Sequence, residues 1–181
     1  MKNIFSIPFI LFSLSSVLAS AAGVKKATEH RHHEAHSHGS ANLAIAFEAT
    51  QGNVEFSGAS EGILGFEHKP KNSKEQKTLD EATQLFETNM KDMVQFAPEL
   101  NCQWTKHSVG QIIQKKSEGS GEHSDWQARF SIICAKAITG TQVIINFERF
   151  KKLKDIDITL IADSVQKSAE YKGQSLTVNI K

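Results

Sequence analysis

The chain has almost no excess of charge of either sign. Its 181 residues include 21 basic and 20 acidic side chains, for a formal net charge of +1 at pH 7. Without Lys2, which lies in an amino-terminal leader, 20 basic residues face 20 acidic ones. A nucleic-acid-binding surface needs an excess of Lys and Arg to neutralise phosphates. The balance therefore predicts no nucleic-acid partner.

Common motifs of hydrolytic enzymes and of cysteine-rich zinc sites are also missing. The sequence has no H-E-x-x-H segment and no C-x-x-C pair, and we predict no nucleophile elbow. After the leader, no run approaches the ~20 apolar residues that a membrane-spanning helix needs. We therefore expect neither an enzyme nor a membrane span in the mature chain.

Cysteine is scarce, with only Cys102 and Cys134. In an exported chain, two cysteines most simply form one disulfide. Closing a loop of about 33 residues would stabilise the fold by roughly 3 to 4 kcal/mol in the chain-entropy model. The alternative is a pair of thiolate metal ligands, although such ligands usually come closer together in the sequence.

The first 21 residues have the features of a secretory signal peptide. Lys2 precedes an apolar run over residues 4–18, and Ala19-Ser20-Ala21 fits a cleavage site after Ala21. Residues 22–40 are polar and without apolar periodicity, which predicts a mobile arm. Residues 41–181 then form a single domain.

Hydrophobic periodicity in the domain predicts an α+β fold of mainly antiparallel β-hairpins, with one long amphipathic helix and a shorter second helix. The long helix begins at Ser73, where Gln76 completes a capping box, and Pro98 ends it. We expect an irregular connection over residues 60–70. Residues 141–153 fit either a short helix or a strand. The first two expected strands, 41–48 and 54–58, are joined by a turn at 51–53. Two more strands are expected at 101–116 and 124–135. The last two, 155–162 and 175–180, are joined by a turn at 171–174.

Histidine is abundant just behind the leader. The segment EHRHHEAHSHG holds five of the chain's eight histidines: His30, His32, His33, His36 and His38. Neutral imidazole is a common metal ligand, and short His-rich tracts are typical of metal binding. Zn²⁺ fits this chemistry, but Cu²⁺ and Ni²⁺ accept the same ligands. A solvated tail without a role is the alternative.

A tight site also needs ligands on the rigid domain, because ordering an arm around an ion costs backbone entropy. His123 and Asp125 are two residues apart at the start of a strand, so their side chains are expected on the same face. Glu67 and His68 lie in the glycine-rich connection, and Glu67 is a further candidate ligand. His107 has no ligand-like neighbour in the sequence and is interpreted as ordinary.

Several short segments occur together in a distinctive order: HSHGSANLAIAFE, GFEHKP, Cys102 after the long helix, HSDWQARFSIIC and GQSLTV. In this order the chain resembles the periplasmic zinc-binding proteins of the ZrgA type. The resemblance implies a protein of the Gram-negative periplasm that captures zinc for an ABC-type importer or its accessory proteins. It also implies ligands at His38, His68, His123 and Asp125, with the other arm histidines auxiliary. One departure is the lack of a proline near FERFKKLK.

Two other function classes remain open. In a zinc-dependent hydrolase, Glu67 or Asp125 would act as the general base beside an open zinc position. In a partner-binding module, the His-rich arm would be passive. An arm rich in interchangeable ligands favours capture and transfer over a fixed catalytic geometry.

Overall fold

The computed structural model describes residues 39–114 and 123–181. The predicted leader and nearly all of the predicted arm lie outside these residues. The described elements are β1 (Ser40–Glu48), β2 (Gln51–Ala59), α1 (Ser60–Leu64), α2 (Ser73–Met93), β3 (Val94–Phe96), a 3-10 turn (Pro98–Leu100), β4 (Gln103–Ile113), β5 (Ser124–Ile133), β6 (Gln142–Ile145), β7 (Asp155–Ala162), β8 (Val165–Tyr171) and β9 (Leu176–Asn179).

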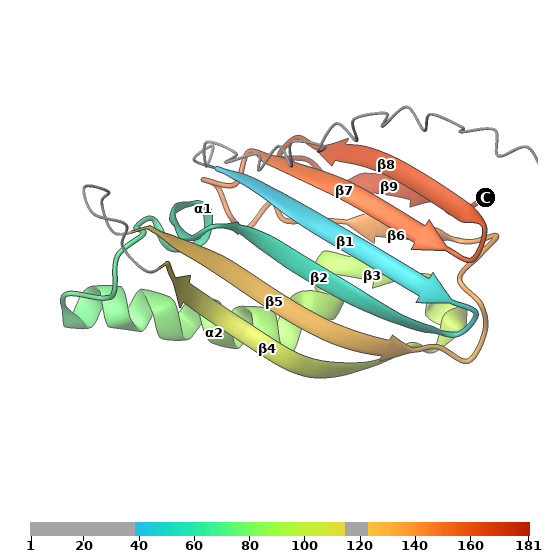
Figure 1. Cartoon of the computed structure of the whole chain (residues 1–181), viewed down its shortest axis with the longest axis horizontal. Coiled ribbons are helices and arrows are strands. Elements are labelled where there is room, and N and C mark those ends of the chain that lie inside the picture. Colours follow the sequence, from blue (N-terminus) through green and yellow to red (C-terminus); the bar gives the residue numbers. More distant parts are fainter. Residues whose placement is uncertain (1–38, 115–122) are drawn as a thin grey trace, which may run out of the picture. The chain divides into compact units, whose positions relative to one another are not determined.

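The main sheet has six strands in the order β4-β5-β2-β1-β7-β8 (Figure 1). All its neighbouring strands are antiparallel except β1 and β7, which run parallel with Ser40 opposite Asp155. The expected α+β class with mainly antiparallel strands is therefore confirmed, but the sheet is mixed and not built from hairpins alone. Long-range pairing brought a strand near the carboxyl end beside β1, and local periodicity carries no information about such a partner.

The first hairpin is confirmed, but its turn lies earlier than predicted. Residues 49 and 50 connect the strands, and the predicted turn at 51–53 belongs to β2. Gly52 pairs with Phe47 across the hairpin. Ala49 takes a positive φ of 49°, although alanine rarely adopts this conformation and therefore gives no turn signal in the sequence.

The long helix is confirmed, with corrections at both ends. Asn72, not Ser73, is the N-cap, since its side chain accepts a hydrogen bond from the backbone N–H of Glu75 at 2.9 Å. The helix ends at Met93, five residues before Pro98. Residues 94–96 instead form β3, which pairs with β6, so a tertiary strand pairing ended the helix.

Other differences concern short elements. A short second helix exists, but it is α1, inside the connection expected to be irregular, and not in the segment 141–153 where the sequence allowed one. The ambiguous segment 141–153 contains strand β6 and then turns. Strand β8 was missed because polar residues dominate VQKSAEY. The turn at 171–174 therefore follows β8 rather than β7, and β9 pairs with β6 in a three-stranded sheet of order β3-β6-β9.

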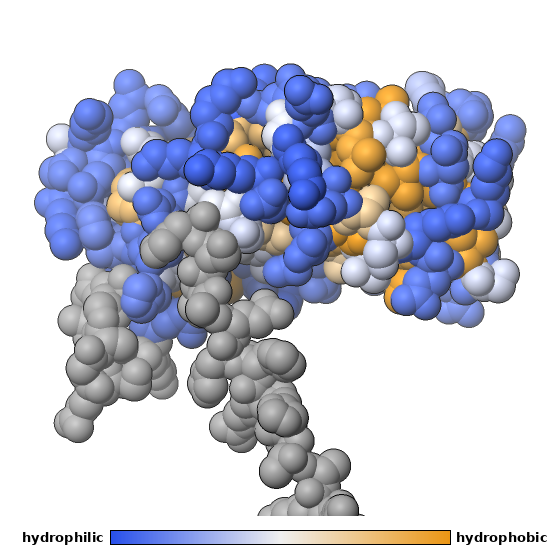
Figure 2. Space-filling model, turned by 90° about the horizontal axis from the view of Figure 1, so that it is seen from above, coloured by the Kyte–Doolittle hydropathy of each residue, from blue (hydrophilic) through white to orange (hydrophobic). Residues whose placement is uncertain are grey.

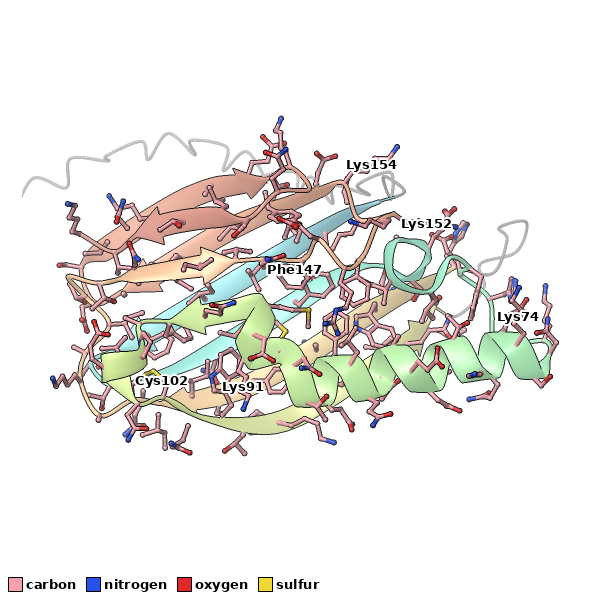
Figure 3. The ribbon with its side chains drawn as sticks, turned by 180° about the vertical axis from the view of Figure 1, so that it is seen from behind. Lys74, Lys91, Cys102, Phe147, Lys152 and Lys154 are labelled. Carbon is pink, nitrogen blue, oxygen red and sulfur yellow. A yellow bond between two sulfur atoms is a disulfide. The ribbon has the colours of Figure 1, made fainter. Side chains whose placement is uncertain are left out.

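One face of the six-stranded sheet is covered by α2 and the small sheet, as Figures 1 and 3 show from opposite sides. Aromatic rings fill the space between these layers. Phe56 of β2 stacks on Phe147 with ring centroids 5.1 Å apart, and Phe86 of α2 lies 5.2 Å from Trp126 of β5. Figure 2 shows a largely hydrophilic face, broken by smaller hydrophobic areas.

Strand β5 has the predicted alternation. Trp126, Ala128, Phe130 and Ile132 are all buried. Cys134 follows on the same face and forms the predicted disulfide with Cys102. The alternative reading of the two cysteines as metal ligands is therefore wrong in this structure, since both sulfurs are bonded to each other.

Candidate metal site

His123 lies immediately before β5 and contacts Glu67 from the connection after α1. Its Nδ1 is 2.7 Å from Oε2 of Glu67. The Glu67 side chain is only 12% exposed, whereas that of His123 is 49% exposed. The carboxylate thus lies inward and the ring lies outward. This pairing joins residues that are 56 positions apart, and nothing local in the sequence indicates it.

His68 is held by its own segment and by α2. Its Nδ1 lies 2.9 Å from the carbonyl oxygen of Lys69 and 3.8 Å from Oε2 of Glu75. Its ring stacks on Phe66, with centroids 5.2 Å apart and planes inclined by 20°. Together these contacts fix both the position and the orientation of the imidazole.

Glu75 is a residue of this site that the sequence interpretation missed. Its Oε2 accepts a hydrogen bond from the backbone N–H of Lys71 at 2.7 Å. This hydrogen bond lowers the pKa of Glu75, and the Asn72 side chain and nearby His68 lower it further. The signal was present, because Asn72-x-x-Glu75 has the spacing of a capping box.

Gln111 connects the two histidine segments. Its Nε2 donates to the carbonyl oxygen of His68 at 3.0 Å and to Oγ of Ser124 at 2.7 Å. Ser124 is the residue after His123 and is buried. The end of β4, the start of β5 and the start of α2 therefore meet at one end of the fold (Figure 1).

Asp125 faces away from the core, as predicted, and its Oδ2 accepts from Nε2 of Gln114 at 2.5 Å. Within residues 39–114 and 123–181, no three or more His, Cys, Asp or Glu side chains gather closely enough to hold an ion. The five arm histidines lie outside the described residues. The complete ligand set of His38, His68, His123 and Asp125 therefore stays a prediction.

His107 lies apart from this site. It occupies a bulge in β4, between Lys106 and Ser108, and its Nε2 contacts Oγ of Ser131 on β5. Ser131 in turn donates to Asn53 of β2 at 3.3 Å. His107 is thus engaged in a polar contact along the sheet.

A G-x-S-x-G pattern does occur, contrary to the expectation above, at residues 58–62. Ser60 follows β2 and begins α1, a strand-to-helix position like that of a nucleophile elbow. Its side chain is fully buried, however, and its Oγ has no hydrogen-bond partner. A catalytic serine must be accessible and hydrogen-bonded to a base. The pattern therefore does not make a hydrolase site in this geometry.

Two oriented imidazoles beside acidic side chains supply the ligand chemistry of a metal-binding protein. A family model agrees with that class: it matches residues 35–180 and is described as a ZrgA family zinc uptake protein. The chain therefore belongs to the ZrgA family of zinc uptake proteins, which confirms the resemblance seen in its motifs. Comparison with curated proteins found no match.

Family membership associates the chain with zinc and with uptake, not with a catalytic activity. Among the described residues, no helix is long and apolar enough to cross a membrane.

Proposed function

We propose that this protein captures Zn²⁺ in the periplasm of a Gram-negative bacterium and delivers it to an ABC-type importer or its accessory proteins. Membership of a zinc uptake family supports the metal and the process. The apolar leader and the cleavage pattern at Ala21 support export. The single observation that carries the site is the link through Gln111, which brings the His68 and His123 segments to one end of the fold.

The proposed site combines ligands on the domain with ligands on the histidine-rich segment that precedes it. His68, His123 and Asp125 are the ligands on the domain. His38 lies one residue before the described region and would close over the ion. His30, His32, His33 and His36 are auxiliary ligands, which raise the local zinc concentration and exchange with one another.

Calorimetric titration of zinc tests this proposal in two forms of the chain, one beginning at residue 22 and one at residue 39. We expect the longer form to bind more ions and to bind the first more tightly, because only it supplies His38. Absence of tight, stoichiometric binding in both forms would refute the metal site. Equal binding by both would instead refute the role of the arm.

Substitution of His123 by alanine should weaken the tightest binding more than tenfold, since it removes a fixed ligand. His107→Ala is the matched control, because it removes an imidazole from the neighbouring strand β4 and should leave zinc affinity unchanged. Titrations with Cu²⁺ and Ni²⁺ compare the metals; imidazole sites generally bind Cu²⁺ more tightly than Zn²⁺, so tight stoichiometric zinc binding is expected, but not a preference over copper.

Delivery is tested separately in cells. Deleting the chain should reduce zinc uptake and growth under zinc limitation, and expression of the unmutated chain should restore both. Restoration by His107→Ala but not by His123→Ala would tie uptake to the proposed site. Normal uptake without the chain would refute the delivery role while leaving zinc binding intact.

A further inference from the structure

We propose that Glu67 is a positioning residue, which holds His123 so that its ring presents Nε2 to the metal, and that the backbone carbonyl of Lys69 holds His68 in the same way. This inference rests on the proposed zinc site and changes the role of Glu67, which was a candidate ligand. It concerns only residues that the structure describes.

The partner of His123 decides where its proton lies. A carboxylate can only accept a hydrogen bond, so at 2.7 Å from Glu67 Oε2 the Nδ1 atom must carry the hydrogen. A neutral imidazole has one N–H, and Nε2 is then left with a free lone pair. The ring is also the more exposed partner, so an arriving ion reaches Nε2 before it reaches the shielded carboxylate.

His68 has the same arrangement with a different acceptor. The carbonyl oxygen of Lys69 can only accept, so Nδ1 carries the hydrogen and Nε2 again has the lone pair. The Glu75 carboxylate lies on the same side at 3.8 Å from Nδ1, too far to accept its hydrogen but close enough to attract the ring. Its own hydrogen bond to the backbone N–H of Lys71 fixes it at the start of α2 before any metal arrives.

This arrangement is the one that metal-binding histidines generally need. A hydrogen bond from the second ring nitrogen to a carboxylate or a carbonyl fixes the tautomer and makes the first nitrogen a better ligand. Loss of such a partner typically costs 10- to 100-fold in metal affinity. The domain thus has two imidazoles already in the required tautomer.

The tautomers are measured directly by NMR of the histidine ring nitrogens in the metal-free chain. We expect hydrogen on Nδ1 in both His68 and His123. In Glu67→Ala the preference should disappear at His123 and persist at His68. Hydrogen on Nε2 of His123 in the unmutated chain would refute the inference, and the measurement requires no zinc.

Zinc affinity then distinguishes a positioning residue from a ligand. Glu67→Ala should weaken binding by about 10- to 100-fold. Glu67→Gln should weaken it much less, because the amide oxygen still accepts from Nδ1. If Glu67 were a ligand, the two variants would lose similar affinity, because a neutral amide is not among the usual zinc ligands.

A double-mutant cycle completes the test and guards against simple misfolding. Once His123 is alanine, Glu67→Ala should cost no further affinity, since Glu67 acts through that ring. A full additional loss would contradict the inference. Glu81→Ala is the matched control: this glutamate lies on the solvent face of α2, is 66% exposed and pairs only with Lys77 at 3.6 Å in the described structure. Failure of the unmutated chain to bind zinc would refute the proposed function instead.

Discussion

At the scale of single residues, the absence of a side chain at Gly52 determines how the first hairpin packs. A Cβ atom there would contact the ring of Phe47 and would lie 2.6 Å from the carbonyl oxygen of Ala46. Phe47 is buried and its ring meets Phe96 edge-on at 5.2 Å. The hydrogen of Gly52 therefore leaves space for an aromatic ring that joins the two sheets.

Gly52→Ala should consequently lower the free energy of unfolding by about 1 to 3 kcal/mol, the usual cost of overpacking. Urea unfolding followed by circular dichroism measures this change. Gly62→Ala is the matched control, because a Cβ at that position would meet its nearest atom, Cδ1 of Leu153, at an ordinary 3.5 Å. Equal stability of Gly52→Ala and the unmutated chain would show that Phe47 can move at no cost.

The sequence indicated that Phe47 points inward, because it alternates with Leu43 and Ile45 in the first strand. It did not indicate the role of Gly52, which was assigned to a turn. Glycine is favoured both in turns and where another group approaches the backbone closely. Only the strand register shows which of these two reasons applies at residue 52.

At the scale of elements, Asp163 ties together three connections. It lies between β7 and β8, and its Oδ1 accepts from the backbone N–H of Ala49 in the β1–β2 turn at 2.8 Å. Its Oδ2 accepts from Oγ1 of Thr139, ahead of β6, also at 2.8 Å. The hydrogen bond from Ala49, with a smaller effect from Thr139, lowers the pKa of Asp163 below its usual 3.8.

A lowered folded-state pKa means that ionised Asp163 stabilises the fold. This stabilisation is complete above the unfolded-state pKa of about 3.8 and is lost as the pH falls through the lower folded-state value. Asp163→Asn should therefore be less stable than the unmutated chain near neutral pH, and the difference should shrink below about pH 4. Urea unfolding at several pH values measures both.

Asp157→Asn is the control for this pH series, since Asp157 lies exposed on the adjacent strand β7. Its stability should follow that of the unmutated chain across the range. A difference at Asp163→Asn that did not depend on pH would mean that the asparagine fails to fit the turn, rather than that the charge is lost.

Elements with strong periodicity were predicted well, and elements that depend on partners were not. The inward residues Ile156, Ile158 and Leu160 of β7 were identified correctly because they alternate with polar or outward residues. Strand β8 beside it has half-buried Lys167 and Ala169 in place of large apolar residues. It is a strand because β7 pairs with it, and an edge strand with one polar face has no clear periodic signal.

At the scale of the whole domain, the disulfide and the proposed metal site lie at different ends. Strand β5 begins next to His123 and ends next to Cys134. About ten residues of strand span roughly 33 Å. Figure 3 likewise places Cys102 far from Lys74, which lies in the first turn of α2 near Glu75. The two features should therefore act independently.

Replacing both cysteines by serine should lower the free energy of unfolding by about 3 to 4 kcal/mol, because the unfolded chain regains the entropy of a 33-residue loop. The folded variant should bind zinc with an affinity within a factor of about two of that of the unmutated chain. Distant sites usually act independently, so loss of the disulfide should not change the metal site. Denaturant unfolding and zinc titration of the same preparation test both statements. A large loss of zinc affinity in a fully folded variant would show that the two ends are coupled.

Several features of this protein rest on local chemistry and can be predicted from the order of its residues. These are the α+β class, the long helix, the inward faces of β1, β5 and β7, the Cys102–Cys134 disulfide and the family. They follow from side-chain periodicity, from cysteine number and from motif order, all of which are written along the chain.

Which distant residues meet depends on long-range strand pairing and packing, and no local pattern predicts it. The parallel pairing of β1 with β7, the strand β3 at the end of α2, and the contact between Glu67 and His123 each join segments far apart in the sequence. The role that we propose for Glu67 depends on that contact. The sequence cannot distinguish a glutamate that binds a metal from a glutamate that orients a metal-binding histidine. The distance from the carboxylate to a ring nitrogen, seen only in the folded chain, supports the second role for Glu67.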